Sequence, residues 1–380
     1  MRVMILHSRY LSGDASGENR VVEDEARLLS NGGHEVRMWA PSARGLNGAD
    51  LLRTGARAVW SRHAAAEVRR VARRFRPDVI HCHNLFPALS PAVLRTSSEA
   101  PVVMTLHNYR LLCLPATLLR DGRICESCVG RVPWPGVVHG CYRGSVPQSA
   151  GMALSIVTHR TVGSFDRVAL FLAVSRFVRD KHVQAGFAPE RIRVKPNFAW
   201  RIPRREGPGE YFLYLGRLSE EKDVGTLLTA WHGVRWPLLI VGDGPERSRL
   251  EAMAPAGVEF RQTVPPSVAA ELLRRARAIL LPSICYEGEP RVVLEAYAAG
   301  VPVVASGIGG LADLVPDGLS GIVASPRSPD AWAEAAERLS DDTESERLGE
   351  GAHQLWQERH SPERGLQELE AAYLESVGRR

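Results

Sequence analysis

The strongest chemical signal in the sequence lies in residues 286–295, where two acids accompany the start of an expected helix. Glu287 and Glu295 are separated by seven residues. Glu287 follows a short apolar run that predicts a buried strand, and Glu295 lies about one turn into a helix expected over 291–300, since Pro290 suits a first helical position. In an open α/β sheet, this place is the ligand crevice, where free N–H groups bind anions. Two acids beside exposed amides favour a ligand with hydroxyls and phosphates, such as a sugar nucleotide.

A second candidate site is the turn at residues 216–223, which follows an expected strand and precedes a helix expected over 224–231. Arg217 and Lys222 leave this turn five residues apart, so both can face one crevice. Two fixed cations would stabilise the charge that builds on a departing diphosphate without help from a metal. The alternative is a solvated basic turn with no ligand.

The N-terminal half offers weaker candidates. Residues 13–19 form a glycine-bearing loop before a helix expected over 21–29, which would let backbone approach a phosphate or an acceptor, although an ordinary turn would look the same. His81 and His83 flank Cys82 at the end of an expected strand. Strand alternation places both histidines on one face, directed either to the crevice or into the core.

Short apolar runs alternate with helical stretches along the whole chain, which predicts parallel sheets flanked by helices. The sequence predicts strands at 3–6, 36–40, 79–82, 102–106, 168–174 and 192–194, and a second set at 211–215, 238–241, 258–260, 278–281, 301–305 and 322–324. We therefore expect two Rossmann-like domains, over residues 1–198 and 210–358, that face each other across a cleft. The segment 199–209, rich in Pro, Gly and Arg, is the expected hinge, and a helix over 362–380 is expected to return to the first domain.

Bulk composition narrows the class of protein. A chain of 380 residues is too long for one ordinary core and predicts two domains. The net charge of +5 fits phosphorylated ligands but is too small to indicate nucleic acid. No apolar run approaches the roughly 18 residues of a membrane-spanning helix, and the chain begins directly with a strand pattern. We expect a cytosolic protein, whose cysteines are thiols or metal ligands rather than disulfides.

Four of the six cysteines fall within 29 residues, in an insertion expected at about 111–144. Cys113, Cys125, Cys128 and Cys141 have the spacing C-x11-C-x2-C-x12-C. Four thiolates with one close pair fit a tetrahedral zinc ion, and a connection this long needs something to hold it. Structural zinc is the favoured interpretation, with unligated thiols and then disulfides as alternatives.

The segment 57–76 carries seven arginines and one acid. Its apolar residues Trp60, Ala64, Val68, Val71 and Phe75 recur on one helix face. The simpler interpretation is a crossover helix with a solvated basic face. The alternative is docking on an anionic membrane surface, to which residues 148–162 would add, and which would suit a lipid-linked acceptor.

Two Rossmann-like domains could also bind a dinucleotide, but the turns after the first and seventh strands lack GxGxxG, which argues against a dehydrogenase. The motifs instead resemble the retaining glycosyltransferases of family four, which have the GT-B fold. The resemblance is carried by residues 216–223, 241–246, the Glu287–Glu295 pair and 300–306, with weaker matches in the first domain.

The resemblance implies a role for each matching residue. Arg217 and Lys222 would hold the donor diphosphate, and Glu295 would bind the ribose hydroxyls. Glu287 would contact the donor sugar, and His107 would touch the same sugar near the reacting carbon. The remaining donor contacts would come from the backbone at Gly17, Gly242, Gly288, Glu289, Pro290 and Arg291. The sequence departs from the family pattern at Glu289, where an apolar residue is usual, and at Asp313, where a glutamate is usual.

These observations predict transfer of a sugar from a nucleotide diphosphate sugar, a UDP-sugar by preference, with retention at the anomeric carbon. The expected acceptor is a growing polysaccharide or lipid-linked glycan of the cell envelope, met at the inner membrane face. No divalent ion is expected to be required. Glu287 as a nucleophile and front-face attack assisted by the leaving phosphate both remain open, the resemblance favouring the second. The rival functions are a sugar-nucleotide epimerase and a non-catalytic binding protein on the same fold.

Overall fold

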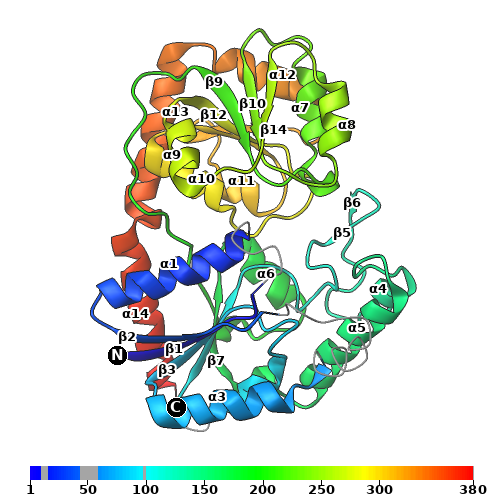
Figure 1. Ribbon diagram of the computed structural model, residues 1–380, viewed down its shortest axis with the longest axis vertical. Helices are drawn as coiled ribbons and strands as arrows, with labels where there is room; N and C mark the ends of the chain where they lie inside the picture. Colours follow the sequence, from blue (N-terminus) through cyan, green and yellow to red (C-terminus); the bar gives the residue numbers. More distant parts are fainter. Residues whose placement is uncertain (10–15, 43–58, 97–99, 380) are drawn as a thin grey trace. The chain divides into compact units, whose positions relative to one another are not determined.

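The structure, a computed structural model, describes residues 1–9, 16–42, 59–96 and 100–379 (Figure 1). The chain divides into two compact units. The first contains residues 1–118, 125–195 and 366–380, and the second contains 119–124 and 196–365.

The first unit is built on a six-stranded parallel sheet with the order β2-β1-β3-β4-β7-β8. Its strands are β1 (Arg2–Leu6), β2 (Glu35–Trp39), β3 (Val79–Cys82), β4 (Val102–Leu106), β7 (Val168–Ala173) and β8 (Ile192–Val194). Its longer helices are α1 (Gly17–Asn31), α3 (Arg62–Phe75), α5 (Val146–Thr161) and α6 (Arg176–Gln184). The connections α1 and α3 lie on opposite faces of the sheet (Figure 1). The central strands β3 and β4 are buried along their whole length, as expected for a sheet covered on both faces.

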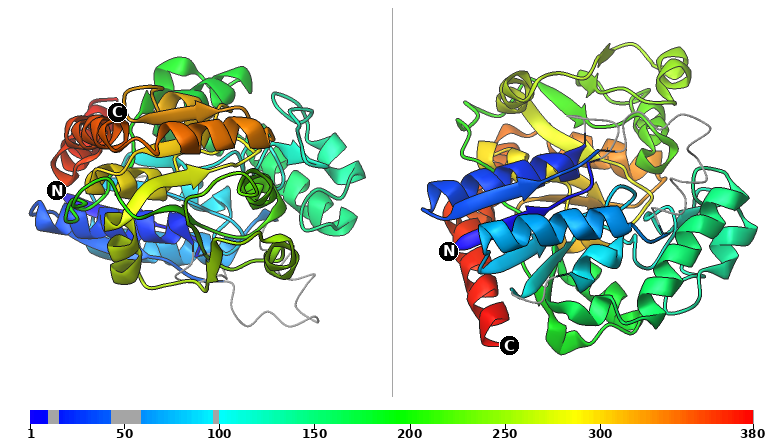
Figure 2. Two further views of the ribbon diagram at one scale, coloured as in Figure 1. Left: turned by 90° about the horizontal axis from the view of Figure 1, so that it is seen from above. Right: turned by 60° about the horizontal axis from the view of Figure 1, so that its bottom comes forward.

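The last helix, α14 (Pro362–Gly378), returns to the first sheet (Figures 1 and 2). The Tyr373 hydroxyl is 2.8 Å from His81 Nδ1 on β3, and Arg193 on β8 forms an ion pair with Glu368 at 2.7 Å. The C-terminal helix is therefore part of the core that surrounds the first sheet.

The segment between β4 and α5 has little regular structure. It contains the two-stranded hairpin β5 (Leu119–Arg120) and β6 (Arg123–Ile124) and the short helix α4 (Trp134–Val138), which packs against α5. The hairpin groups with the second unit and the rest with the first. Positive φ angles at Ala116 and Leu118 mark tight turns before the hairpin, and the positive φ at Asp121 falls in the hairpin turn itself.

The second unit repeats the architecture with the strand order β11-β10-β9-β12-β13-β14, all parallel. Its strands are β9 (Tyr211–Leu215), β10 (Leu238–Val241), β11 (Val258–Arg261), β12 (Ala276–Leu281), β13 (Val303–Ser306) and β14 (Gly321–Ala324). Its helices are α7 (Val224–Ala230), α8 (Arg247–Met253), α9 (Pro266–Arg274), α10 (Arg291–Ala299), α11 (Gly310–Leu314), α12 (Pro329–Arg338) and α13 (Asp342–Leu355). Two apolar cores, one centred on α10 and one on α7 and α12, cover this sheet.

All twelve strands expected from the apolar runs are present within one or two residues. The two Rossmann-like sheets confirm the predicted fold class. The short antiparallel hairpin β5–β6 was not predicted, because strands of two residues leave no periodic signal.

Candidate functional site

In the second unit, the turn after β9 carries the two predicted cations. Residues 216–223 include a short helical turn, η6 (Glu220–Lys222), directly before α7. Arg217 is exposed, and its carbonyl oxygen accepts a hydrogen bond of 2.7 Å from the Tyr214 hydroxyl. Lys222 is half-buried. The turn therefore has a fixed backbone and presents one exposed and one partly enclosed cation at the carboxyl end of the sheet.

Lys222 meets the acidic turn after β12. Its Nζ lies 2.5 Å from Glu287 Oε1, and the Ser283 hydroxyl donates to the same oxygen at 2.7 Å. The side chains of Lys222 and Glu287 are 26% and 14% exposed, so the pair is accessible at its edge. An ammonium has three N–H donors, and Lys222 can therefore bind a phosphate oxygen while it keeps Glu287.

The electrostatics of this pair follow from its geometry. Burial alone would lower the pKa of Lys222, but the nearby Glu287 carboxylate outweighs burial and raises that pKa. Burial alone would raise the pKa of Glu287, but Lys222 and Ser283 hold it below its ordinary value. Both groups are therefore charged at neutral pH.

Helix α10 begins beside this pair. Pro290 stands at its N-cap, and no side chain caps the first turn. Glu295, one turn inside the helix, forms an ion pair of 3.1 Å with Arg291 and is 20% exposed. The helix start thus combines backbone donors, a cation and an acceptor-only carboxylate, as expected for an anion with hydroxyls next to it.

Glu289, one of the two residues at which the sequence departs from the family pattern, contacts Asn197 and His360 inside the second unit. Its Oε2 accepts a hydrogen bond of 2.5 Å from the Asn197 backbone N–H, and its Oε1 lies 3.9 Å from His360 Nδ1. The side chain is 3% exposed. Glu289 therefore ties the loop before α10 to the segment at Asn197.

Gly242, a predicted donor contact, has a clear role in the turn itself. Its φ is +152°, and a Cβ at this position would lie 1.8 Å from the carbonyl oxygen of Gly216. A Cβ on Gly244 would lie 2.1 Å from the carbonyl oxygen of Leu218. The turn after β10 therefore lies against the turn that carries Arg217, and only glycine allows this approach.

In the first unit, His107 follows β4 and lines a small pocket of about 20 Å³ together with His83, Asn84, Asn108 and Arg110. His107 Nε2 lies 2.8 Å from His83 Nδ1. Burial, with smaller effects from nearby cationic groups, lowers the pKa values of both histidines well below their ordinary value. His107 is therefore a neutral imidazole that can donate one hydrogen bond and accept another.

Of the predicted glycine loop, only the helix start at Gly17 lies within the described residues; residues 13–15 lie outside them. Gly17 opens α1, and the Ser16 hydroxyl caps the helix by accepting from Asn19 N. Asn19 Oδ1 is 2.8 Å from His7 Nε2, which joins this helix start to the end of β1.

The four cysteines of the predicted zinc site lie in and around the hairpin and α4. Cys113 and Cys128 are buried, whereas Cys125 and Cys141 are half-buried. Burial, reinforced by the nearby Cys128, raises the pKa of the Cys113 thiol to about 11. In the described part of the chain, the group of three or more ligand side chains with atoms within 4.8 Å of each other is a different one, Glu25, His81 and His83.

Two features near the candidate residues were not predicted from the sequence. One is the hydrogen bond from Ser283 to Glu287. The other is the buried ion pair between Glu25 on α1 and Lys195 after β8, whose side chains are both 0% exposed. A signal existed for the second, because Glu25 shares a helix face with Val21 and Leu28, both buried.

Two family models match consecutive parts of the chain. "Glycosyltransferase Family 4" matches residues 15–199, and "Glycosyl transferases group 1" matches residues 209–342. The alpha-D-kanosaminyltransferase of Streptomyces kanamyceticus is 28% identical over 337 residues, which is 83% of each chain. The D-inositol 3-phosphate glycosyltransferase of Paenarthrobacter aurescens is 27% identical over 96% of this chain and 93% of its own length.

Solved structures support the same architecture. The sucrose-phosphate synthase of Thermosynechococcus elongatus matches with a TM-score of 0.73 at 18% identity, over 100% of both chains. The Anabaena protein HepE, solved with UDP and glucose, matches with a TM-score of 0.66 at 16% identity, over 98% of both chains.

The two parallel sheets and the charged turns at the ends of the second sheet define a GT-B fold of the glycosyltransferase type. The chain belongs to the group 1, family 4 glycosyltransferases and is a glycosyltransferase. Among the described residues, no helix is long and apolar enough to cross a membrane.

Proposed function

We propose that this enzyme transfers a sugar, with retention, from a nucleotide diphosphate sugar to a polysaccharide or lipid-linked glycan. The Lys222–Glu287 pair carries the proposal, because a half-buried ammonium is held at 2.5 Å by a carboxylate in the turn that leads into α10. Lys222 and Arg217 would bind the diphosphate and stabilise its charge as the glycosidic bond breaks. Glu295 would accept from the ribose hydroxyls, and Glu287 from the donor sugar.

A UDP-sugar is the proposed donor. Its support is that HepE, which shares the fold, was solved with UDP and glucose. A thermal-shift screen against UDP-, GDP-, ADP- and dTDP-sugars tests the base, since a ligand that binds only the native state raises Tm by mass action. The expected result is a shift with UDP-sugars that is lost in Lys222→Ala. Equal shifts with all four nucleotides would contradict the choice of UDP.

Retention requires a separate measurement. NMR of the first product formed from an α-linked donor should show an α-linkage, which a β-linked product would contradict. Attack from the front face, assisted by the leaving phosphate oxygen, needs no protein base beside the acceptor. The two cations would then supply the charge stabilisation, so chelation of divalent ions by EDTA should leave the rate unchanged.

Incubation of the enzyme with the donor alone distinguishes a transferase from the rival epimerase. A transferase without acceptor leaves the donor unisomerised apart from slow hydrolysis, whereas an epimerase forms an isomer. A binding protein would give neither reaction with any acceptor.

Docking on an anionic membrane is proposed for the first unit. Helices α4 and α5 pack against each other, and both expose apolar side chains. These are Trp134 and Val138 on α4 and Val146 and Leu154 on α5. Residues 127–165 contain no Asp or Glu, and Arg131 and Arg143 in this segment are exposed. Apolar side chains beside cations suit the interface of an anionic bilayer, where a lipid-linked acceptor would be met.

Vesicle sedimentation tests this docking. We expect binding to vesicles that contain phosphatidylglycerol, weak binding to pure phosphatidylcholine, and loss of binding in a Trp134→Ser/Leu154→Ser variant. Met253→Ser, which removes an exposed apolar side chain of the second unit, is the matched control. If the Trp134→Ser/Leu154→Ser variant and the Met253→Ser control bind the anionic vesicles equally well, this surface does not dock on the membrane.

Structural zinc on Cys113, Cys125, Cys128 and Cys141 also remains a proposal. Cys113 and Cys128 are buried near one another, which a zinc site would explain. Elemental analysis should give about one zinc per chain, in line with a single site of four thiolates. The metal should be lost in Cys125→Ser and kept in Cys285→Ser.

A further inference from the structure

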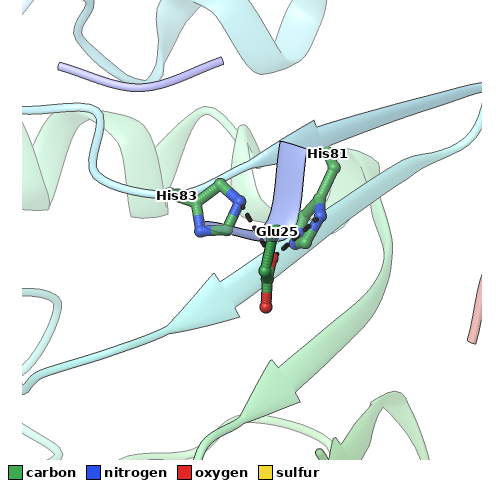
Figure 3. A group of neighbouring side chains, drawn as sticks. All are labelled: Glu25, His81 and His83. Atoms are coloured by element: carbon green, nitrogen blue, oxygen red, sulfur yellow. Dashed lines mark ion pairs between the residues drawn. The ribbon is translucent and has the colours of Figure 1, made fainter. Parts of the chain in front are cut away.

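Behind His107, the first unit contains a buried cluster of charged and imidazole side chains. His81, His83, Glu25 and Lys195 are each 0–1% exposed. They come from α1, from β3 and its end, and from the end of β8, and Figure 3 shows Glu25 directed toward both histidines. The proposed transfer chemistry uses none of these four residues.

The two oxygens of Glu25 have different surroundings. Oε1 accepts from the Lys195 ammonium in a short ion pair. Oε2 lies 3.5 Å from His83 Nε2 and 3.9 Å from His81 Nδ1. Within the described ranges, neither Glu25 Oε2 nor His83 Nε2 has a hydrogen-bond partner that meets strict geometry.

His81 is already satisfied by other groups. Its Nδ1 lies 2.8 Å from the Tyr373 hydroxyl, and its Nε2 lies 2.7 Å from Thr105 Oγ1. Glu25 Oε2 and His83 Nε2 are therefore the two buried polar atoms that face each other, and burial without a partner would be costly for both.

One carboxylate and two histidines are also a ligand set that zinc accepts. Two observations argue against a cation at this point. The Lys195 ammonium already neutralises the same carboxylate and would repel a metal ion, and ligation by His81 would require loss of its bond to Tyr373. A proton on His83 Nε2, shared with Glu25, satisfies the same atoms without a second cation.

The position of the proton on His83 determines which nitrogen of His107 carries its proton. Burial lowers the pKa values of His83 and His107, so each ring is neutral and carries a single N–H. If His83 donates from Nε2 to Glu25, its Nδ1 has only a lone pair. The group 2.8 Å away, His107 Nε2, must then be the donor. The rings are inclined by only 16°, which suits such an in-plane bond.

We propose that Glu25 and His83 are positioning residues that hold His107 as its Nε2–H tautomer, with Nδ1 left as the hydrogen-bond acceptor for a hydroxyl of the donor sugar. This inference rests on the proposed function together with the contact between His107 and the donor sugar that the resemblance to family four implies. The role resembles that of outer-shell partners that orient metal-bound histidines, which fix a tautomer through the second ring nitrogen.

The direct test is long-range ¹H–¹⁵N NMR on protein labelled at histidine nitrogen, with His107 and His83 assigned from His107→Asn and His83→Asn. The unchanged enzyme should show both rings as Nε2–H tautomers. An Nδ1–H tautomer of His107 would overturn the proposal. This outcome is observed in the unchanged enzyme, and the two variants serve only to assign the signals. Signals of His83 that shift on addition of zinc and return with EDTA would also overturn it, in favour of a metal site.

The matched variant is Glu25→Leu/Lys195→Met, which removes both charges and leaves neither one unpaired. The His107 tautomer should become mixed, and kcat should fall by about 10–100-fold, the loss typical of outer-shell partners, with little change in KM for the donor. Tyr373→Phe is the control, because it alters a bond to His81 in the same cluster but lies off the path to His107. The proposal fails if the double variant keeps the tautomer, or if Tyr373→Phe changes it equally.

Failure of the proposed function would look different. If His107→Ala kept normal kcat while the NMR showed the expected tautomers, the chain of hydrogen bonds would stand and the contact with the donor would be refuted. Should the double variant not fold, His83→Phe supplies the same kinetic comparison, because it removes both ring nitrogens from the path and keeps a planar ring.

Discussion

Two lysine–glutamate pairs in this enzyme have the same chemistry and opposite surroundings. Lys222 and Glu287 lie at the carboxyl end of the second sheet, 26% and 14% exposed. Lys195 and Glu25 lie inside the first unit, both 0% exposed. The first pair has an accessible edge on which a diphosphate could be bound, whereas the second can act only on its neighbours. Exposure therefore separates an ion pair that a ligand could reach from one that is enclosed in a core.

The largest expected effect concerns stability and the buried pair. Lys195→Met alone leaves the Glu25 charge buried and should lower the free energy of unfolding by about 3–5 kcal/mol. The Glu25→Leu/Lys195→Met double variant should recover most of that loss. Urea unfolding measures both values. Equal losses in the single and double variants would show that packing, rather than the unpaired charge, sets the cost.

The second effect concerns catalysis and the accessible pair. Lys222→Ala should lower kcat by about 10²–10³-fold, the effect of removing one fixed donor from a developing anion. Its free energy of unfolding should change by only about 1 kcal/mol or less, since the pair is partly solvated. Arg275→Ala, which removes an exposed ion pair with Glu210, is the control. A variant of Lys222 with normal kcat would remove the donor site from this turn.

A smaller loss is expected at Glu295. Glu295→Gln keeps the size of the side chain but weakens its bond to Arg291, and it should also weaken the proposed acceptance of ribose hydroxyls. KM for the donor should rise by about 10–100-fold, as expected for loss of a hydrogen bond to a charged group worth about 1.5–3 kcal/mol. Steady-state kinetics at fixed acceptor test this. A change confined to kcat would indicate a different role.

The two regions should also respond differently to pH. Burial lowers the pKa of His81 to about 4 and the pKa values of His83 and His107 below their ordinary value, so the unfolded chain binds protons first as pH falls from 6.5. Each such histidine should cost about 1.4 kcal/mol per pH unit between its unfolded and folded pKa values. Glu287, whose pKa is lowered, stabilises the fold above about pH 4.5 and loses this contribution only below it.

Urea unfolding between pH 7 and pH 4 distinguishes these contributions. A His81→Gln/Tyr373→Phe variant should show a shallower loss of stability over this range than the unchanged enzyme. A Glu287→Gln/Lys222→Met variant should follow the unchanged enzyme down to about pH 5. Parallel curves for all three proteins would contradict the assignment of the acid sensitivity to the histidines.

The sequence was sufficient to predict the strands of both sheets and the start of α10. Buried parallel strands give continuous apolar runs, and the start of α10 was visible from Pro290 and its acids. The sequence placed Lys222 and Glu287 each in a turn after an expected strand. The structure was needed to show that β9 and β12 are neighbours and that the two residues form an ion pair across 65 positions. The cluster around Glu25 was harder to predict from the sequence. One acid on an apolar helix face indicates a buried partner, but it does not identify Lys195, which follows β8 far away in the chain. The resemblance assigned the backbone of Glu289 to the donor contacts, and it gave no sign that the side chain accepts a hydrogen bond from the Asn197 backbone.

The contact of Gly242 with the carbonyl of Gly216 has a consequence for engineering. The loops that follow β9 and β10 behave as one interlocked piece, since any side chain at Gly242 or Gly244 would collide with the opposite backbone. Directed evolution toward a new donor should therefore leave these two glycines unchanged.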